Sequence, residues 1–213
     1  MFSLSPRLAA VARMIPRGAA LADIGSDHAY LPIYMISHEA VASAIASDIS
    51  APCVARAKDN AGRYGVADRI SFRCADGLSG IRPDECDTVV IAGMGGETMG
   101  AILEAAPWAL EKRLILQPAS RAPFLRRWLY AHGCAVAEET VVRDSGRLYP
   151  VLAAAKGEPP RGELFEYASP ALLSHADDPD VRAYLERTAA LLEKEVGRDH
   201  RALTAALRDA AKG

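Results

Sequence analysis

The stretch that decides the fold is Leu21-Ala22-Asp23-Ile24-Gly25-Ser26-Asp27-His28-Ala29-Tyr30-Leu31-Pro32. An apolar run ends in an acidic residue, a glycine turn and a polar triplet follow, and a second apolar element then begins. This order places backbone N–H groups and polar side chains at the carboxyl end of a strand, where open α/β sheets bind their ligands. The stretch therefore predicts a strand, a turn and a helix that together carry a ligand site.

Outward from this stretch, the apolar pattern predicts repeated strand–helix units. Val89-Val90-Ile91 is a continuous apolar run, which is typical of a parallel strand covered on both faces. Asp144-Ser145-Gly146 separates the last two strand-like segments and is typical of a hairpin turn. Five units followed by a hairpin predict an α/β fold with one doubly wound, Rossmann-like sheet, because crossover connections are right-handed. Strands are expected at residues 19–24, 42–46, 70–74, 87–92, 113–117, 135–142 and 147–155, and helices at residues 4–15, 30–38, 52–64, 98–104 and 124–132.

The composition changes at residues 156–161, where a glycine and two prolines are typical of a linker. Beyond it, apolar residues repeat at helical spacing over residues 181–196, with Asp180 as the expected N-cap and Gly197 as the expected end. A shorter apolar stripe at residues 203–210 predicts a second helix, and two such helices in series favour a helical hairpin. The expected domains are a sheet domain at residues 1–156 and a helical, coiled-coil-like extension at residues 161–213.

Composition and charge exclude several classes of protein. The net charge of −2 gives no general attraction to nucleic acid or to a lipid surface, so an RNA partner needs a local basic cluster. The four cysteines are scattered without a C-x-x-C pair, which favours reduced thiols and predicts neither a disulfide framework nor a metal site. The longest uncharged runs fall short of the ~20 residues of a membrane helix. We expect a monomer in the cytoplasm, without a targeting segment or an obligate protein partner.

Three of the predicted strands end at or near an aspartate. Asp23, Asp48 and Asp76 are 25 and 28 residues apart, about one strand–helix unit, so we expect their carboxylates in register along one sheet edge. One carboxylate could face an ammonium group, a second could accept both ribose hydroxyls, and a third could accept a proton from an adenine amino group. This row suits a cation that contains a nucleoside. The alternative is that each aspartate caps the helix that follows it, where a carboxylate suits the helix dipole.

Asp27 distinguishes between two classes of cofactor. A dinucleotide fingerprint, G-x-G-x-x-G, beginning at Gly25 would place glycines at positions 27 and 30, which are Asp27 and Tyr30 in this chain. A carboxylate at position 27 would lie against a pyrophosphate, which is electrostatically unfavourable. S-adenosylmethionine carries a positive sulfonium and no phosphate, so the sequence favours that cofactor.

Five motifs together resemble a known family. They are L-S-P-R-L at residues 4–8, D-I-G-S-D-H-A-Y-L-P at 23–32, A-G-M-G-G at 92–96, L-I-L-Q-P at 114–118 and L-R-R-W-L at 125–129. In this order, over about residues 4–155, they resemble the bacterial tRNA (adenine-N1)-methyltransferases that modify position 22. The resemblance implies a class I methyltransferase domain with a helical C-terminal extension, S-adenosylmethionine as cofactor and tRNA as substrate.

The resemblance also implies which residues surround the cofactor. Residues 25–27 would line its methionine end, Asp48 its ribose, residues 76–77 its adenine, and residues 92–94 the wall between them. No metal is expected. With their neighbours, the expected cofactor residues are Asp23, Gly25, Ser26, Asp27, His28, Asp48, Ile49, Asp76, Gly77, Ala92, Gly93 and Met94.

The chemistry of the implied reaction points to Asp27 as the catalytic residue. N1 of adenine already has a lone pair, so its methylation needs no strong general base. The enzyme must align N1, the methyl carbon and the sulfur, and stabilise positive charge that moves onto the ring. Our hypothesis is that the Asp27 carboxylate accepts a hydrogen bond from the exocyclic amine. Alternatively, Asp27 only caps the following helix or orients the cofactor ammonium.

Basic and aromatic residues near the predicted strand ends are candidates for tRNA contacts. Arg121, Arg126 and Arg127 form one cluster, and Arg7 belongs to a second cluster near the N-terminus. Tyr30 would either stack on a base or pack in the core. Two other functions stay open: a small-molecule methyltransferase on the same fold, and a catalytically silent RNA-binding module. The expected substrate residues are Arg7, Tyr30, Gln117, Arg121 and Arg126.

Overall fold

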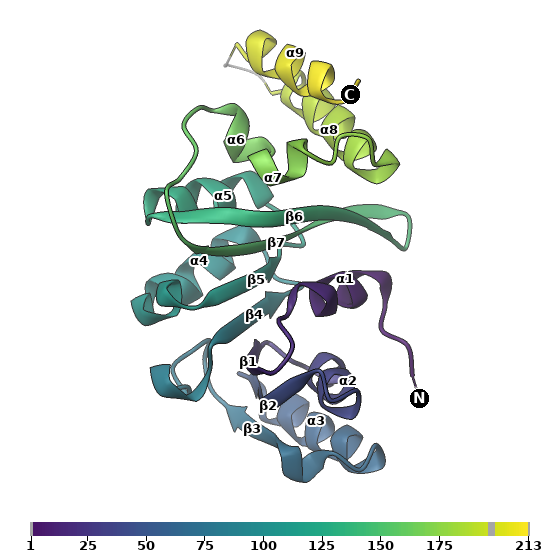
Figure 1. Ribbon diagram of the computed structural model, residues 1–213, viewed down its shortest axis with the longest axis vertical. Helices are drawn as coiled ribbons and strands as arrows, with labels where there is room; N and C mark the ends of the chain where they lie inside the picture. Colours follow the sequence, from purple (N-terminus) through teal and green to yellow (C-terminus); the bar gives the residue numbers. More distant parts are fainter. Residues whose placement is uncertain (1, 196–198, 213) are drawn as a thin grey trace.

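The computed structural model describes residues 2–195 and 199–212, and its centre is one twisted sheet (Figure 1). The strands are β1 (Ala19–Ile24), β2 (Val41–Asp48), β3 (Ile70–Cys74), β4 (Thr88–Ala92), β5 (Arg113–Gln117), β6 (Cys134–Asp144) and β7 (Arg147–Lys156). They form one sheet in the order β3-β2-β1-β4-β5-β7-β6. β1 to β5 are parallel, and β7 is antiparallel to both β5 and β6. The predicted Rossmann-like sheet and its terminal hairpin are confirmed.

Two hydrophobic clusters cover the two faces of the sheet. One cluster contains side chains of α1 (Pro6–Met14), α2 (Tyr30–Ser37) and α3 (Ala51–Arg63). The other contains side chains of α4 (Gly96–Glu104), α5 (Ala122–Ala131) and the short 3-10 helix Pro107–Glu111. In β4, Val90 packs into the first cluster while Val89 and Ile91 pack into the second, and all three are fully buried. This central strand is therefore covered on both faces, as its continuous apolar run predicts. Two further 3-10 helices span Ala67–Arg69 and Pro83–Glu85.

The C-terminal extension packs on the antiparallel edge of the sheet (Figure 1). Its elements are α6 (Leu164–Tyr167), α7 (Pro170–Leu173), α8 (Pro179–Leu192) and α9 (Arg201–Ala210). Helices α8 and α9 pack against each other as the predicted hairpin, and their hydrophobic cluster includes Val141 of β6. No described helix combines the length and the apolar character that crossing a bilayer requires.

Three details of the extension differ from the sequence-based expectation. Helix α8 is capped by Asp178 rather than Asp180, because Oδ1 of Asp178 accepts a hydrogen bond from the Asp180 N–H at 2.7 Å. Helices α6 and α7 have four residues each, which is too short to show a helical period in the sequence. Helix α8 also ends at Leu192, before the expected end at Gly197, which itself lies outside the described residues.

Candidate active site

A cavity of about 320 Å³ lies at the carboxyl ends of β1 and β4, a volume within the ~300–1,000 Å³ of small-molecule sites. Helix α1 borders one side, and the β1–α2 loop borders the other. The cavity brings together seven predicted cofactor residues and three predicted substrate residues. Its lining comprises Arg7, Leu8, Asp23, Gly25, Ser26, Asp27, His28, Tyr30, Leu31, Ala92, Gly93 and Gln117.

The β1–α2 loop is held in an unusual backbone conformation. Gly25, Asp27 and Ala29 have positive φ angles of 69°, 47° and 55°. For the two non-glycine residues this conformation costs of order 1 kcal/mol each, so the surrounding structure must impose it. The end of β2 does so: the N–H groups of Gly25 and Ser26 donate to the Ser47 carbonyl at 2.8 and 3.0 Å. The Asp27 N–H donates to Oδ2 of Asp48 at 3.1 Å. Asp27 is thereby fixed at the cavity with more than half of its side chain exposed.

Gly25 permits a close approach between this loop and the β4–α4 turn. A Cβ atom at Gly25 would lie 2.1 Å from Cε of Met94, far inside the contact distance of two carbon atoms. The positive φ angle at this position favours glycine for a second, independent reason. Because the Met94 methyl group ends a flexible side chain that can move, the positive φ angle is the stronger of the two reasons for glycine at this position.

Asp23 forms a buried carboxyl group at the floor of the cavity. It is 5% exposed, and its Oδ2 accepts a hydrogen bond from Oγ of Ser26 at 2.5 Å. Burial raises the pKa of Asp23 to about 7, although the Ser26 hydrogen bond acts against the shift and the nearby Asp48 adds to it. No Lys, Arg or His forms an ion pair with Asp23 within the described residues. The floor thus offers a carboxyl group that lacks a cationic partner.

The three strand-end aspartates are stepped rather than in register, which corrects the sequence-based prediction. Asp23 lies opposite Ala46, two residues before Asp48, and Asp48 lies opposite Cys74, two residues before Asp76. Each strand therefore carries its carboxylate two residues farther along than the preceding one. The exposure of the three side chains increases from the buried Asp23, through Asp48, to the exposed Asp76. Asp48, Ile49, Asp76 and Gly77 consequently lie outside the cavity lining, and Met94 of the β4–α4 turn also lies outside it.

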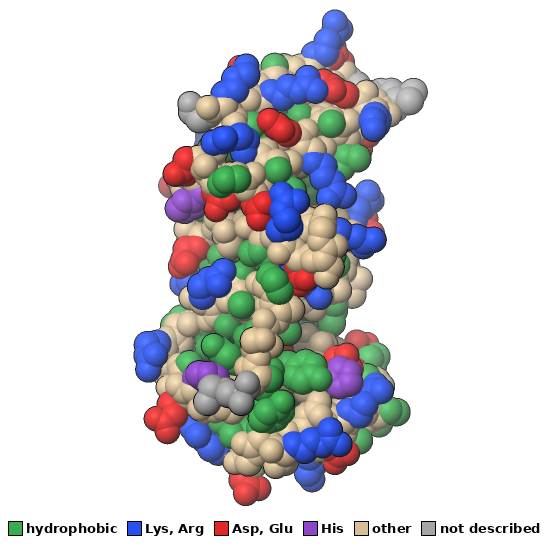
Figure 2. All heavy atoms as spheres, turned by 90° about the vertical axis from the view of Figure 1, so that its right-hand side faces the viewer, with side chains coloured by type: hydrophobic (Ala, Val, Ile, Leu, Met, Phe, Trp, Pro, Cys, Tyr) green, Lys and Arg blue, Asp and Glu red, His purple; other side chains and the backbone are tan. Residues whose placement is uncertain are grey.

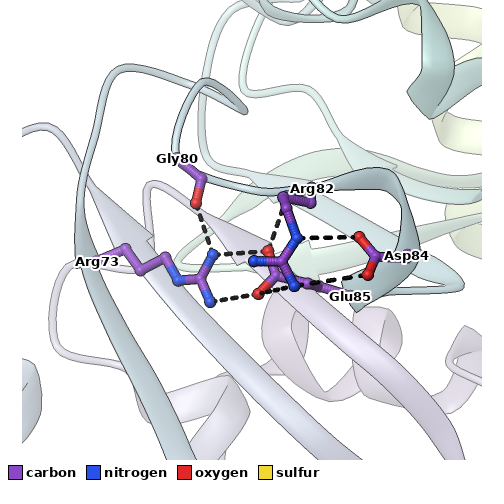
Figure 3. Close-up of polar contacts among 5 residues, drawn as sticks. All are labelled: Arg73, Gly80, Arg82, Asp84 and Glu85. Carbon is purple, nitrogen blue, oxygen red and sulfur yellow. Dashed lines mark hydrogen bonds and ion pairs between the residues drawn. The ribbon is translucent and has the colours of Figure 1, made fainter.

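The loop that carries Asp76 and Gly77 is fastened by one ion pair (Figure 3). The Arg73 guanidinium donates to both carboxylate oxygens of Glu85, at 2.7 and 2.8 Å, and to the Gly80 carbonyl at 2.6 Å. Glu85 also accepts a hydrogen bond from the Arg82 N–H at 2.8 Å. These bonds, led by those from Arg73, lower the pKa of Glu85 to about 2. The pair joins the end of β3 to the far end of the loop, and so holds its turn in place.

Arg7 and Gln117 close the cavity from the β5 side. Oε1 of Gln117 accepts hydrogen bonds from Nη1 of Arg7 and from the Gly93 N–H, both at 3.2 Å. Arg7 also pairs with Asp144 at 3.4 Å, and its guanidinium lies 5.1 Å from the ring centroid of Tyr149. Sequence reasoning missed Asp144 and Tyr149, because a hairpin more than 130 residues away gives no local signal of a contact with Arg7. Both predicted residues line the cavity, with Gln117 itself buried.

His28 and Tyr30 form a ring pair at the cavity. Their ring centroids are 5.5 Å apart with an interplanar angle of 23°, and Nε2 of His28 is 3.5 Å from Oδ2 of Asp27. Tyr30 is 41% exposed, so core packing is the wrong alternative for this residue. Its ring also contacts Phe2 at 5.5 Å. The face of the molecule shown in Figure 2 has hydrophobic side chains gathered on its lower part, and Lys and Arg side chains along its length.

Arg126 is a structural residue, so its prediction as a tRNA contact is wrong. Its side chain is fully buried and forms an ion pair with the fully buried Glu139. The guanidinium also donates to the Glu166 carbonyl at 3.2 Å and to the Tyr184 hydroxyl at 3.3 Å. A phosphate on the surface cannot reach it. Arg121, by contrast, is exposed and pairs with Glu97 at 2.8 Å.

The residues fit S-adenosylmethionine. The buried Asp23 suits a positively charged amino-acid end, and the Asp27 carboxylate would repel a pyrophosphate at the same loop. No described group of three or more His, Cys, Asp or Glu side chains is arranged to hold a metal ion.

Comparisons with known proteins agree with this geometry. A model of a methyltransferase domain family matches residues 4–152. The tRNA (adenine(22)-N(1))-methyltransferase of Bacillus subtilis is 43% identical over 157 residues, which cover 73% of this chain and 66% of that protein.

Two solved structures match nearly the whole chain. The m1A22 tRNA methyltransferase TrmK of Bacillus subtilis has a TM-score of 0.83 at 31% identity, covering all of this chain and 97% of that chain. Streptococcus pneumoniae Sp1610 in complex with S-adenosyl-L-methionine has a TM-score of 0.85 at 32% identity, covering 99% of this chain and 98% of that chain. These neighbours therefore share both the sheet and the helical extension with this chain.

Proposed function

The chain belongs to the family of bacterial tRNA (adenine(22)-N(1))-methyltransferases, and we infer that it methylates N1 of adenine 22 in tRNA with S-adenosylmethionine as the methyl donor. S-adenosylhomocysteine is then the second product. The observation that supports this function most is the Asp27 carboxylate, held at the cavity by a strained loop beside an unpaired buried carboxyl group. This arrangement suits a cationic cofactor and a substrate that gains positive charge.

In this proposal the carboxyl edge of the sheet holds the cofactor. When bound, the cofactor supplies a methyl group activated by the sulfonium charge. Asp23, Ser26 and His28 lie around the methionine end, with Gly25 and Asp27 forming the turn. Asp48 and Ile49 face the ribose, and Asp76 and Gly77 flank the adenine. The wall between them is Ala92, Gly93 and Met94.

Asp27 is the proposed catalytic residue. Its carboxylate accepts a hydrogen bond from the exocyclic amine of the target adenine, which orients N1 and stabilises the positive charge that reaches the ring. His28, 3.5 Å away, and Arg56, 3.9 Å away, limit the positions that the carboxylate can take. No proton need leave N1, since its lone pair forms the new bond. The adenine must leave its base stack to enter the cavity.

The substrate side of the cavity is formed by Arg7, Tyr30 and Gln117, with Arg121 at the loop beyond it. The exposed Tyr30 ring offers a stacking surface for the extruded base. Residues 1–156 act as the methyltransferase domain, and residues 161–213 act as the helical extension. The protein acts as a monomer in the cytoplasm, where tRNA is processed.

Mass spectrometry of nucleosides from tRNA incubated with the protein and the cofactor tests the activity. We expect 1-methyladenosine at position 22, and none in a transcript with guanosine at that position. Methylation of small molecules without methylation of tRNA would contradict the proposal.

Single-turnover methylation by an Asp27→Asn variant tests the mechanism. We expect the rate to fall about a hundredfold with the cofactor Kd unchanged, because one preorganised contact to the developing charge is lost. A near-normal rate would leave Asp27 with only a structural role.

A further inference from the structure

A second cavity lies between the C-terminal extension and the β5–α5 loop. It has a volume of about 380 Å³ and is bordered by residues 118–124, by β7 and by helix α8. We call it the junction cleft. None of the residues proposed above to hold the cofactor lines it.

The charges that line the junction cleft are mostly positive. Arg121, Arg127 and Arg187 are exposed cations, whereas Glu195 is the carboxylate among the lining residues. Arg121 and Arg127 are each paired with a carboxylate that does not line the cleft, Glu97 at 2.8 Å and Glu166 at 3.6 Å. Within the described residues, the Arg187 side chain has no hydrogen bond or ion pair. A guanidinium group with free donors at the edge of a cleft is a suitable contact for a phosphate.

Apolar and aromatic side chains form the rest of the cleft wall. Phe124 and Tyr167 supply half-buried rings, Tyr184 is buried at 9% exposure, and Leu191 of α8 is 57% exposed. Leu191 is one of the few large apolar side chains exposed to this degree in the described chain. Rings and an exposed leucine beside arginines provide a surface for a planar base together with donors for its phosphate.

The junction cleft and the catalytic cavity share one loop as a common wall. Gln117 lines the catalytic cavity, and the next residue, Pro118, lines the junction cleft. The loop is fixed because the Ala119 N–H donates to the Met94 carbonyl at 2.8 Å, and the Gly96 N–H donates to the Ser120 carbonyl at 2.9 Å. The two cavities are therefore separated by one fixed loop, and an RNA strand that lies across this loop reaches both.

We propose that the junction cleft binds one unpaired nucleotide of the substrate tRNA, adjacent to the target adenine. Its base packs against Leu191 and the facing rings, and its phosphate is bound by Arg187 with Arg121 and Arg127 nearby. The positive charge of the cleft favours a polyanionic ligand, whereas a groove for a basic peptide would have an acidic rim. The position next to the catalytic cavity favours the substrate tRNA as that polyanion. This inference rests on the proposed function, and it assigns to the extension a direct contact with the substrate.

Two variants of α8 test the proposal against a matched control. Arg187→Gln removes the free cation, and Leu191→Glu places a carboxylate where the base packs. Arg182→Gln is the control, since Arg182 is an exposed arginine of the same helix that lies outside the cleft and donates to the Asp177 carbonyl at 3.3 Å. All three proteins should keep the wild-type melting temperature and cofactor Kd.

We expect Arg187→Gln to raise the KM for tRNA about fivefold, to leave kcat unchanged and to reduce the salt dependence of tRNA binding by about one counterion. Leu191→Glu should raise the KM further. With a tRNA that has an abasic nucleotide next to adenine 22, Leu191→Glu should raise the KM very little further. The missing base and the substitution remove the same contact, so their effects do not add. The control should behave as wild type.

Equal tRNA affinities for both cleft variants and the control would overturn the proposal while leaving the methyltransferase activity intact. A dimer in light scattering that Leu191→Glu converts to a monomer would also overturn it, since the cleft would then hold a second copy of the chain. Absence of tRNA methylation by the wild-type protein would instead contradict the proposed function. Gel-shift affinities of the same variants would still test the cleft in that case.

Discussion

Two regions of this molecule bury charged groups, and they do so in opposite ways. At the junction of β6 with the C-terminal helices, Arg126 and Glu139 are fully buried as an ion pair, and Arg126 has two further hydrogen-bond acceptors. At the floor of the catalytic cavity, Asp23 is buried with a hydroxyl as its hydrogen-bond donor and no cation. Burial of an unpaired carboxylate is costly, so Asp23 keeps its proton to a higher pH than an exposed aspartate does, and a cationic ligand would favour its charged form. The paired site stabilises the fold, and we propose that the unpaired one serves cofactor binding.

The largest effect is expected from breaking the paired site. Glu139→Ala leaves the Arg126 guanidinium buried without its counter-charge, and should lower the free energy of unfolding by about 3–5 kcal/mol. Urea denaturation measures this. The double variant Arg126→Met, Glu139→Leu is the control, because it removes both charges and should recover most of the loss. A single variant as stable as wild type would show that water reaches the pair.

The unpaired site should make stability depend on pH in a defined direction. Because burial raises the pKa of Asp23 from 3.8 to about 7, the folded protein keeps a proton that the unfolded chain releases. The unfolded state binds fewer protons in this window, so stability falls as pH rises from about 4 to about 7 and then levels off. Asp23→Asn should remove this slope.

Urea denaturation of the cofactor-free protein at pH 4.5 and pH 8 measures the slope. From pH 4.5 to pH 8, the wild type should lose about 3 kcal/mol more unfolding free energy than Asp23→Asn does. This follows because one pKa unit corresponds to about 1.4 kcal/mol. Bound cofactor should reduce the wild-type slope, because a cation near Asp23 favours its charged form. Identical slopes in the two proteins would contradict the assignment of a raised pKa to Asp23.

The parts of the molecule that were predictable from the sequence are those determined by neighbouring residues. The strands at Ile70–Cys74 and Arg113–Gln117 match their predicted bounds, because alternating apolar residues in the first, a continuous apolar run in the second, and the turn residues beside them are local signals. The β1–α2 loop was also predictable, since a glycine followed by polar residues after a buried strand has few alternatives. Local chemistry thus identifies most of the cavity lining.

What the sequence missed depends on contacts between distant segments. Arg126 follows Arg121 and precedes Arg127, so by composition all three look alike, and its burial follows from Glu139 and from Tyr184 of α8. The two-residue step between the strand-end aspartates follows from strand register, which a spacing of 25 or 28 residues does not determine. Periodicity gives the face of an element, whereas register and ion-pair partners arise from tertiary packing.

A smaller effect is expected from the glycine that brings the functional region together. Gly25→Ala should destabilise the protein by about 1–2 kcal/mol, because a positive φ angle disfavours alanine. The new Cβ would also displace the Met94 methyl group, 2.1 Å away, and so weaken cofactor binding. Gly18→Ala is the matched control, since Gly18 has a similar φ of 77° with open space around it. Calorimetry should show weakened cofactor binding only for Gly25→Ala; equal effects would assign the loss to backbone strain alone.

The smallest effect is expected from the Arg73–Glu85 ion pair. Like Arg126 and Glu139 it joins two opposite charges, but it lies beside the loop that carries Asp76 and Gly77. Arg73→Lys keeps the charge but loses the double hydrogen bond that fastens the loop carrying Asp76 and Gly77. We expect the cofactor Kd to rise by less than about tenfold, with kcat unchanged. Because the pKa of Glu85 is lowered to about 2, the stabilisation by this pair is complete above pH 4.5 and is lost only as pH falls towards 2. Cofactor affinity in this variant should therefore keep the pH profile of the wild type, and calorimetry at pH 6 and pH 8 checks it. A changed profile would mean that the loop acts through Asp23, and that the paired and unpaired regions are coupled rather than independent.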